Sequence, residues 1–299
     1  MAPLTLVLRN DVYRRPLETA LGRLGLGPGW RCADIGAGGG DVTVALARVV
    51  GTAGRVYAVD IDPASRDEVA EAAASVAGAQ VVAITQAAEE LLLPEQVDLA
   101  YCRFLLMHVI DPAAVLSRMA LATRPGGWVL VQEPVTTAGR VDGTPMSMPS
   151  ARHPDIGALL PRLAIDAGLE LVDAWAEAPA GAGPGPVASY LEDLTGVSPG
   201  LDPVVLPPLV TVVAKKPGGP ARRPSDHDDA PEHLATAHSC ESPLHIAEAD
   251  GLAHKSIQVE PALAVQLYER REVPARQAVP VPGRPERPAG AGVGHHDRF

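Results

Sequence analysis

The chain has 299 residues, of which 46% are hydrophobic, enough for at least one globular domain with a substantial core. Its formal net charge of −11 argues against non-specific nucleic-acid binding, because phosphate binding requires clustered lysine and arginine. No apolar run approaches the roughly 20 residues of a membrane-spanning helix, and charged residues interrupt the segment 1–16 before a signal-length apolar core develops. We therefore expect a cytoplasmic protein that acts on a small molecule, without a membrane or nucleic-acid partner. The sequence carries no indication of its oligomeric state.

Up to residue 217, apolar strand-like runs alternate with segments of helical periodicity. This alternation predicts a doubly wound, Rossmann-like α/β domain with a mostly parallel sheet between two layers of helices. Two late strands joined without a full crossover predict an antiparallel edge. The expected strands are 30–35, 55–60, 79–84, 97–101, 127–133, 169–177 and 208–214. The expected helices are 16–24, 41–50, 64–77, 86–92, 104–110, 112–122, 151–168 and 186–194.

The composition changes at residues 218–299, which carry seven of the nine histidines, ten of the thirty prolines and no tryptophan. Such a segment is poorly equipped to build a core, so we interpret it as a disordered, low-complexity tail that follows a domain at 1–217. Apolar periodicity returns only at 259–272, where a short helix-like patch is expected. An alternative origin of the tail is a shifted reading frame in GC-rich coding sequence.

A glycine-rich loop lies between the first expected strand and the helix that follows it. Gly36, Gly38 and Gly40 allow positive φ and a close approach of the backbone to a ligand. Their spacing differs from the dinucleotide fingerprint G-x-G-x-x-G, in which a pyrophosphate lies at the helix N-terminus. Asp34 at the strand tip opposes a pyrophosphate and suits a cation. Asp60, at the end of the second strand, has the position from which a carboxylate accepts both hydroxyls of a ribose.

Four segments follow one another in an order and at a spacing that are more specific than the glycine loop alone. They are ADIGAGGG at 33–40, VYAVDID at 56–62, AAEELLLPEQVDLAYCRFLLMHV at 87–109 and ALATRPGGWVLVQEP at 120–134. Together they resemble the class I S-adenosylmethionine-dependent methyltransferases, particularly the small-molecule enzymes of the ubiquinone/menaquinone-methyltransferase-like group. The resemblance covers about 20–217. It implies seven strands with the last one antiparallel, S-adenosyl-L-methionine as cofactor and S-adenosyl-L-homocysteine as its product.

The resemblance also assigns residues to the cofactor. The glycine loop would surround its methionine part, Asp60 would hold the ribose, and Ile61 would flank the adenine. The backbone at Ala88 would contact the edge of the adenine ring. The residues expected to bind the cofactor are Asp34, Gly36, Ala37, Gly38, Gly40, Asp60, Ile61, Ala87, Ala88 and Arg103.

Two features depart from the family pattern. Where relatives usually have an aspartate facing the adenine amino group, this chain has Ala87, which cannot accept that hydrogen bond. We expect reduced cofactor affinity, since such a bond is worth about 0.5–1.5 kcal/mol, although Gln86 or Glu89 could substitute as acceptor. Relatives also often cover the cofactor with N-terminal helices, whereas little chain precedes the first strand here. Either Tyr13 or Arg14 contributes to a lid, or the first expected helix is an ordinary surface helix.

Transfer of a methyl group to an oxygen, nitrogen or carbon atom depends on alignment and exclusion of water, because the donor is already activated. A dedicated base is optional. His108 is the candidate base, since the segment after the fourth strand lines the ligand crevice of open α/β sheets. Its alternative is a histidine packed on a helix. Arg103, Glu133 and His153 are the candidate substrate-binding residues, with structural alternatives: Arg103 pairing with Glu133 or Asp98, and Glu133 merely closing its strand.

The leading hypothesis is a methyltransferase that acts on a small molecule. Two rivals stay open: a non-catalytic cofactor-binding or regulatory protein that retains the fold, and an NAD-dependent oxidoreductase, which Asp34 and the glycine spacing disfavour. No metal site is expected, because Cys32, Cys102 and Cys240 lie far apart and match no zinc spacing. The first two cysteines fall within apolar strand-like runs, where a small buried side chain is expected.

Overall fold

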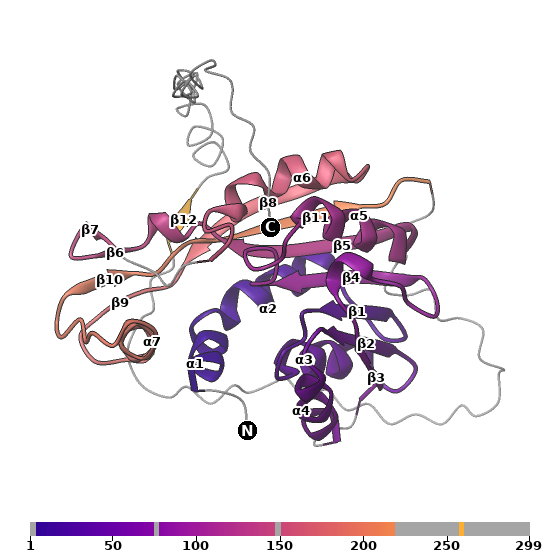
Figure 1. The fold of residues 1–299 in the computed structure, drawn as a ribbon, viewed down its shortest axis with the longest axis horizontal. Helices are drawn as coiled ribbons and strands as arrows, with labels where there is room; N and C mark the ends of the chain where they lie inside the picture. The colour runs from indigo at the N-terminus through magenta and orange to yellow at the C-terminus, as the bar shows by residue number, and fades with distance from the viewer. Residues whose placement is uncertain (1–3, 75–77, 147–150, 219–256, 260–299) are drawn as a thin grey trace, which may run out of the picture.

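The computed structural model describes residues 4–74, 78–146, 151–218 and 257–259. The strands of its main sheet are β1 (Arg31–Ile35), β2 (Arg55–Asp60), β3 (Gln80–Thr85), β4 (Val97–Arg103), β5 (Thr123–Pro134), β8 (Glu170–Ala178), β11 (Leu209–Lys215) and β12 (Ile257–Val259). They lie in the order β12-β8-β11-β5-β4-β1-β2-β3 (Figure 1). Strands β1 to β5 pair in parallel, whereas β11 is antiparallel to both of its neighbours.

The predicted α/β fold, with seven strands and an antiparallel late strand, is confirmed, and β12 adds an eighth strand to the sheet. The two late strands β8 and β11 pair antiparallel on the side of the sheet beyond β5, as expected, and β11 lies between β5 and β8. The short strand β12 pairs antiparallel with β8 and forms this edge of the sheet. Apart from Gly218 and β12, the segment 218–299 lies outside the described residues, and with it Cys240 and the patch beyond Val259.

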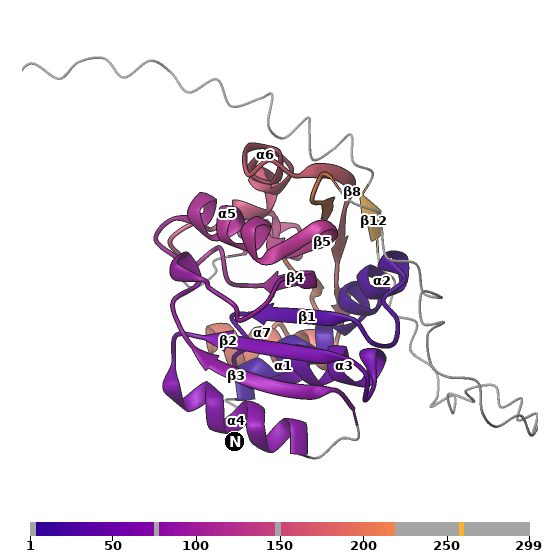
Figure 2. The ribbon, with the colours of Figure 1, turned by 90° about the vertical axis from the view of Figure 1, so that its right-hand side faces the viewer.

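Helices cover both faces of the main sheet. They are α1 (Leu4–Val12), α2 (Arg14–Leu24), α3 (Asp41–Val50), α4 (Pro63–Ala74), α5 (Pro112–Ala122), α6 (Leu160–Asp166) and α7 (Pro186–Thr195). Helices α2 and α3 pack on one face, and α5 and α6 pack on the other (Figure 2). No helix among the described residues is long and apolar enough to cross a membrane.

The central strands are buried on both faces, which explains their almost continuous apolar sequence. Every position of β4 is buried, and successive side chains alternate between the two layers of helices. Leu99 and Tyr101 belong to the core beneath α2 and α3, whereas Ala100 and Cys102 belong to the core beneath α5 and α6. Both Cys32 and Cys102 are fully buried, as predicted.

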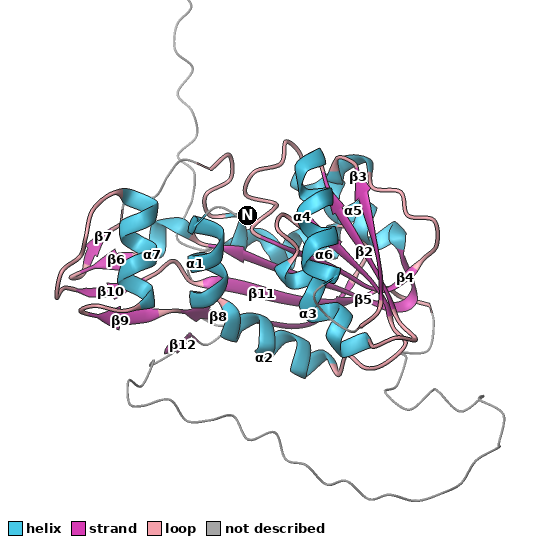
Figure 3. Ribbon diagram, turned by 90° about the horizontal axis from the view of Figure 1, so that it is seen from below, coloured by secondary structure: helices cyan, strands magenta, loops and turns pink. Residues whose placement is uncertain are grey.

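A second, smaller sheet has the order β7-β6-β10-β9 and was not expected from the sequence. Its strands have only two or three residues each, too few to show a period of two. Helix α7 packs against this sheet, and α1 lies beside α7 (Figure 3). The buried rings of Tyr13 and Tyr190 lie in the apolar cluster between them. The strands are β6 (Arg140–Val141), β7 (Thr144–Pro145), β9 (Ala180–Ala182) and β10 (Pro203–Val205).

Three of the expected helices differ in the structure. The expected helix at 104–110 is wrong, because that segment is a turn. The first helix after β4 begins only at Pro112, where the Asp111 carboxylate caps its N-terminus by accepting the Ala114 N–H at 3.0 Å. The segments 86–92 and 151–168 are also less helical than expected. The former contains only the 3₁₀ turn η1 (Ala88–Glu90), and the latter contains the 3₁₀ turn η3 (Ile156–Leu159) followed by the short α6.

Gly157 in η3 provides a test of this packing. A Cβ at this position would lie 2.5 Å from the carbonyl oxygen of Glu133 and 2.8 Å from that of Pro134, both of them backbone atoms of β5. We expect Gly157→Ala to lower the free energy of unfolding by about 1–3 kcal/mol in urea titrations, because the strand has to shift. Gly22→Ala, in α2 with no atom within 4 Å of the added carbon, is the control and should not destabilise. Equal effects of the two substitutions would contradict this packing.

Candidate functional site

The carboxyl ends of the parallel strands form one edge of the main sheet, where ligands bind in open α/β folds. The loop after β1 crosses this edge with φ angles of 76° at Gly36, 50° at Gly38 and 85° at Gly40, which favour glycine. A Cβ at Gly36 would also lie 2.9 Å from Leu105 Cδ1. The loop and the turn after β4 are therefore in contact only because this position lacks a side chain.

Two cavities lie against this loop, and Gly36 lines both. The larger, which we name the β2 cavity, has a volume of about 640 Å³. The smaller, which we name the β1 cavity, has a volume of about 30 Å³, the room of about one water molecule. The β2 cavity brings together Asp60, Ile61, Ala87, Ala88, Leu105 and His108, among others. The β1 cavity brings together Asp34, Ala37, Gly38, Tyr101 and Arg103 with residues of α1.

Asp60 ties the end of β2 to the glycine loop. Its Oδ2 atom accepts the N–H of Gly38 at 2.8 Å, and its Oδ1 atom accepts the N–H of Asp62 at 2.9 Å. The carboxylate is only partly buried and lies on the wall of the β2 cavity. It is therefore accessible to hydroxyl donors of a ligand in that cavity.

Asp34 is buried at the tip of β1. The hydroxyl of Thr43 donates a hydrogen bond of 2.7 Å to its Oδ2 atom. Burial raises the pKa of Asp34 to about 6, against the opposing effects of this hydrogen bond and of the Arg103 charge. A cation in the β1 cavity would favour the ionised form of this carboxyl group.

Arg103, at the end of β4, is hydrogen-bonded to α1 and to the residue that follows it. It does not form the ion pair with Glu133 or Asp98 that was considered from the sequence. Its guanidinium donates to Asn10 Oδ1 at 2.9 Å and to the carbonyl oxygen of Tyr13 at 3.2 Å. The two acids considered as its partners are engaged elsewhere: Asp98 pairs with Arg124, and Glu133 accepts backbone donors.

Glu133 is fully buried at the end of β5 and lines neither cavity. Its Oε1 atom accepts the N–H groups of Leu105 and Leu106, both at 2.7 Å, and Oε2 lies 3.4 Å from the N atom of Met107. Burial raises the pKa of Glu133 to about 7, although these donors favour the ionised form. Glu133 therefore stabilises the turn after β4.

The remaining candidates lie in different surroundings. His108 is exposed on the wall of the β2 cavity, and partial desolvation together with the charge of Arg9 lowers its pKa. Its neutral ring can accept a proton near neutral pH.

Two other candidate residues lie outside both cavities. His153 lines neither cavity, and its Nε2 atom lies 3.2 Å from the carbonyl oxygen of Val109. Gly40 is also outside both cavities, and a Cβ there would lie 3.2 Å from Val69 Cα in α4.

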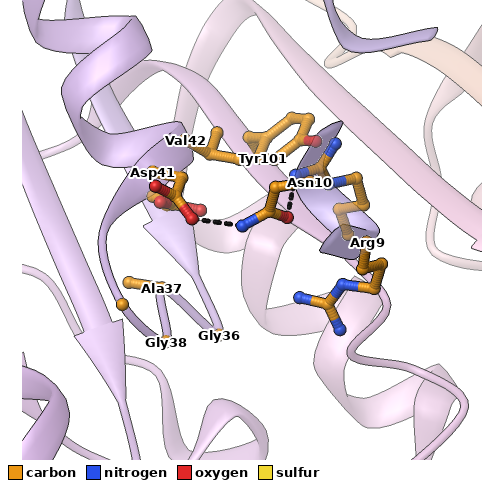
Figure 4. Close-up of a pocket in the computed structure, with 11 residues that line it drawn as sticks. Arg9, Asn10, Gly36, Ala37, Gly38, Asp41, Val42 and Tyr101 are labelled. Atoms are coloured by element: carbon orange, nitrogen blue, oxygen red, sulfur yellow. Dashed lines mark hydrogen bonds between the residues drawn. The ribbon is translucent and has the colours of Figure 1, made fainter. Parts of the chain in front are cut away.

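Helix α1 supplies two residues that the sequence analysis missed. Asn10 donates to the carboxylate of Asp41 and accepts from Arg103, and so bridges the start of α3 and the end of β4 (Figure 4). Arg9 lines the β1 cavity on the side opposite this bridge. The local signal for them is weak, because α1 has only nine residues and no acidic residue in its first turn. Among the described residues, no group of three His, Cys, Asp or Glu side chains is arranged to hold a metal ion.

The chain is similar to known methyltransferases over about a third of its length. Residues 33–131 match the family model described as a methyltransferase domain. The ubiquinone biosynthesis O-methyltransferase of Paracidovorax citrulli (strain AAC00-1) is 36% identical over 110 residues, which are 35% of this chain and 44% of that protein. The ubiquinone/menaquinone biosynthesis C-methyltransferase UbiE of Vibrio vulnificus (strain YJ016) is 34% identical over 114 residues, which are 36% of this chain and 43% of that protein.

The comparison with solved structures concerns the fold alone. The crystal structure of the protein BH2331 from Bacillus halodurans C-125 aligns with a TM-score of 0.53 at 16% identity, over 68% of this chain and 99% of that chain. The matched region spans less than half the length of the two curated relatives. The residues that match the family model include the glycine loop and the ends of β1, β2 and β4.

The raised pKa of Glu133 predicts how stability depends on pH. The folded state retains a proton that the unfolded state loses between about pH 4.5 and pH 7, so the contribution of Glu133 is present below this window and lost as the pH rises through it. Relative to the wild type, Glu133→Gln should therefore gain stability from pH 5 to pH 8, on the order of 3 kcal/mol in urea unfolding. The glutamine keeps an acceptor for Leu105 and Leu106 and does not ionise.

The control for this measurement is Glu90→Gln, at an exposed position of η1. Its difference in stability from the wild type should stay the same at pH 5 and pH 8. An equally constant difference for Glu133→Gln would show that the Glu133 carboxyl group is not desolvated as the structure indicates.

Proposed function

Because this chain belongs to the class I S-adenosylmethionine-dependent methyltransferase family, we propose that it transfers the methyl group of S-adenosylmethionine to a small-molecule acceptor. The attacked bond would be the one between sulfur and the methyl carbon, and the new bond would join that carbon to an oxygen, nitrogen or carbon atom of the acceptor. S-Adenosylhomocysteine leaves with the electron pair of the broken bond, and the acceptor loses a proton.

The observation that carries the proposal is the placement of Asp34 and Asp60 around one glycine loop. Asp60 presents a partly buried carboxylate in the β2 cavity, where it would accept the ribose hydroxyls, and Ile61 and Ala88 would lie against the adenine. Asp34 would balance positive charge at the β1 cavity. The residues present therefore fit a nucleoside joined to a cationic group. They fit a dinucleotide less well, because Asp34 would repel a pyrophosphate.

The cofactor supplies the activated methyl group when it is bound, so the protein has to align the acceptor and exclude water. His108 would accept the acceptor's proton, since its lowered pKa keeps the imidazole neutral. Helix α1 would shield the reacting atoms. The β1 cavity has to widen to take the methionine part, and the Asn10 bridge from α1 to Asp41 and Arg103 is the contact that closes it.

Calorimetry of the full chain with S-adenosylmethionine, S-adenosylhomocysteine and NAD, followed by a mass-spectrometric screen of phenols, quinols, amines and carboxylic acids, tests this function. Binding of both adenosyl compounds and a gain of one methyl group on an acceptor would support it. Binding without transfer to any acceptor would favour the rival, a non-catalytic cofactor-binding protein. Binding of NAD alone would overturn the proposal.

Asp60 provides the sharpest test of the cofactor position. Asp60→Ala should weaken S-adenosylhomocysteine binding by about 10- to 100-fold, because hydrogen bonds to a charged group are worth roughly 1.5–3 kcal/mol. Asp62→Ala, which removes a neighbouring exposed carboxylate that accepts the N–H of Ala64, is the matched control with little effect. His108→Ala should leave this affinity within about twofold while reducing methyl transfer. Equal losses for Asp60→Ala and Asp62→Ala would show that the ribose lies elsewhere.

An aspartate in place of Ala87 should increase the affinity for the cofactor product. It lies on the wall of the β2 cavity with an extended backbone, directly before η1. Ala87→Asp should tighten S-adenosylhomocysteine binding by about 2- to 12-fold, since a new acceptor for the adenine amino group is worth about 0.5–1.5 kcal/mol. Calorimetry with S-inosylhomocysteine, which lacks that amino group, is the control and should show no gain. A similar gain for both compounds would contradict the assigned position of the adenine.

A further inference from the structure

A second acid on the wall of the β2 cavity uses only one of its two carboxylate oxygens. Glu89 of η1 lines this cavity and is half-buried. Its Oε1 atom accepts the N–H of Ile110, from the turn after β4, at 3.0 Å. Its Oε2 atom has no hydrogen-bond partner among the residues that the structure describes. One oxygen of a fixed carboxylate is therefore available to a donor in this cavity.

The main chain of Glu89 is fixed as well. Arg118 of α5 donates from Nε to the carbonyl oxygen of Glu89 at 3.2 Å. The N–H of Glu90 donates to the carbonyl oxygen of Ala87 at 3.1 Å, which closes the 3₁₀ turn. With the bond to Ile110, η1 is held both to α5 and to another wall of the cavity. An acceptor that is already held in place loses little conformational freedom when a ligand binds.

The other polar side chains of the β2 cavity are engaged or exposed. Gln86 is half-buried there, but its Oε1 atom accepts the N–H of Leu92 at 3.0 Å. Because a backbone N–H can only donate, it fixes the oxygen end of this amide and leaves the NH2 group, a donor, as the free end. Asp60 is the acid assigned to the ribose. The remaining ones are exposed, so that water competes for their hydrogen bonds: Glu90, His108 and Asp111.

Large apolar side chains lie open on the walls of the same cavity. Ile61, directly after β2, is 70% exposed, and Ile110 is 76% exposed. Covering such side chains is favourable because it removes apolar surface from water. A cavity with apolar walls and one anchored polar group suits a flat ring with a hydrogen-bonding group at its edge.

We propose that Glu89 determines which base the site accepts, by accepting a hydrogen bond from the adenine amino group at its Oε2 atom. Ile61 and Ile110 would cover the ring. The amino group has two hydrogens, so the second remains for an acceptor at position 87, in keeping with the gain expected for Ala87→Asp. A base with an oxygen in place of the amino group would be rejected, since two acceptors would then meet. This inference rests on the proposed methyltransferase function.

The test is calorimetry on the full chain with S-adenosylhomocysteine and S-inosylhomocysteine, which carries an oxygen in place of the amino group. The wild type should bind the adenosyl compound at least about tenfold more tightly, because the bond involves a charged acceptor.

Glu89→Gln should reverse the order of the two affinities. The N–H of Ile110 retains the amide oxygen, as the N–H of Leu92 does at Gln86, so an NH2 group replaces Oε2 in the cavity. This donor matches the oxygen of the inosyl compound and not the amino group. Glu90→Gln, which removes the same charge from the neighbouring exposed position of η1, is the matched control. It should keep the preference of the wild type within about twofold.

Three outcomes would overturn the inference: equal binding of the two compounds by the wild type, an adenosyl preference that survives in Glu89→Gln, or an equal loss of preference in Glu90→Gln. Binding of neither compound by Glu89→Gln would also overturn it, because Glu89 would then only support the turn after β4. Tight binding of S-inosylhomocysteine by Glu89→Gln shows that the variant is folded. Failure of the wild type to bind S-adenosylhomocysteine would instead count against the proposed function itself.

Discussion

The crevice depends on one buried carboxylate. Glu133, near the end of β5, accepts the N–H groups of Leu105 and Leu106 from the turn after β4, so one buried carboxyl group fixes two neighbouring strand ends to each other. Without this acceptor, the two N–H groups would be left unpaired in the interior. The chain becomes helical only at Pro112, after Asp111 caps the N-terminus of α5.

The fixed turn then determines both cavities. Leu105 meets the glycine loop where Gly36 has no side chain, and His108 follows on the wall of the β2 cavity. Phe104, at the start of the same turn, supports Arg9. A single acceptor on β5 thus sets the position of the loop contact, of the candidate base and of the aromatic surface beneath α1.

The sequence predicts the parallel part of the sheet because its signals are local. Buried strands such as β2 and β4 are continuous apolar runs, and the glycines after β1 mark a sharp turn at a strand end. The segments that were missed depend on distant partners. Helix α1 is held by Arg103 through Asn10, and the short strands β6 and β10 pair with each other across more than sixty residues of sequence. No periodicity within nine or three residues could reveal such contacts.

In the candidate site, too, the sequence predicts what depends on local signals and misses what depends on distant partners. Asp34 and Asp60 lie at the ends of strands that are visible in the sequence, and the structure places both beside the glycine loop. Glu133 follows a visible strand too, yet its environment depends on a turn that periodicity misassigns as a helix. The direction of a side chain at a strand end is decided by the donors around it, and these come from other segments of the chain.

The two cavities differ in their charged side chains: those of the β2 cavity are acidic apart from His108, whereas the β1 cavity has both acidic and basic ones. Asp60 lines the β2 cavity, whereas Asp34, Asp41, Arg9 and Arg103 line the β1 cavity together. Under the proposed function, the Asp34 carboxylate would attract the sulfonium group of the cofactor. Methyl transfer would remove the positive charge from sulfur, so the attraction between Asp34 and the product would weaken when release is needed. The charge that helps to bind the methyl donor would therefore not hold back its product.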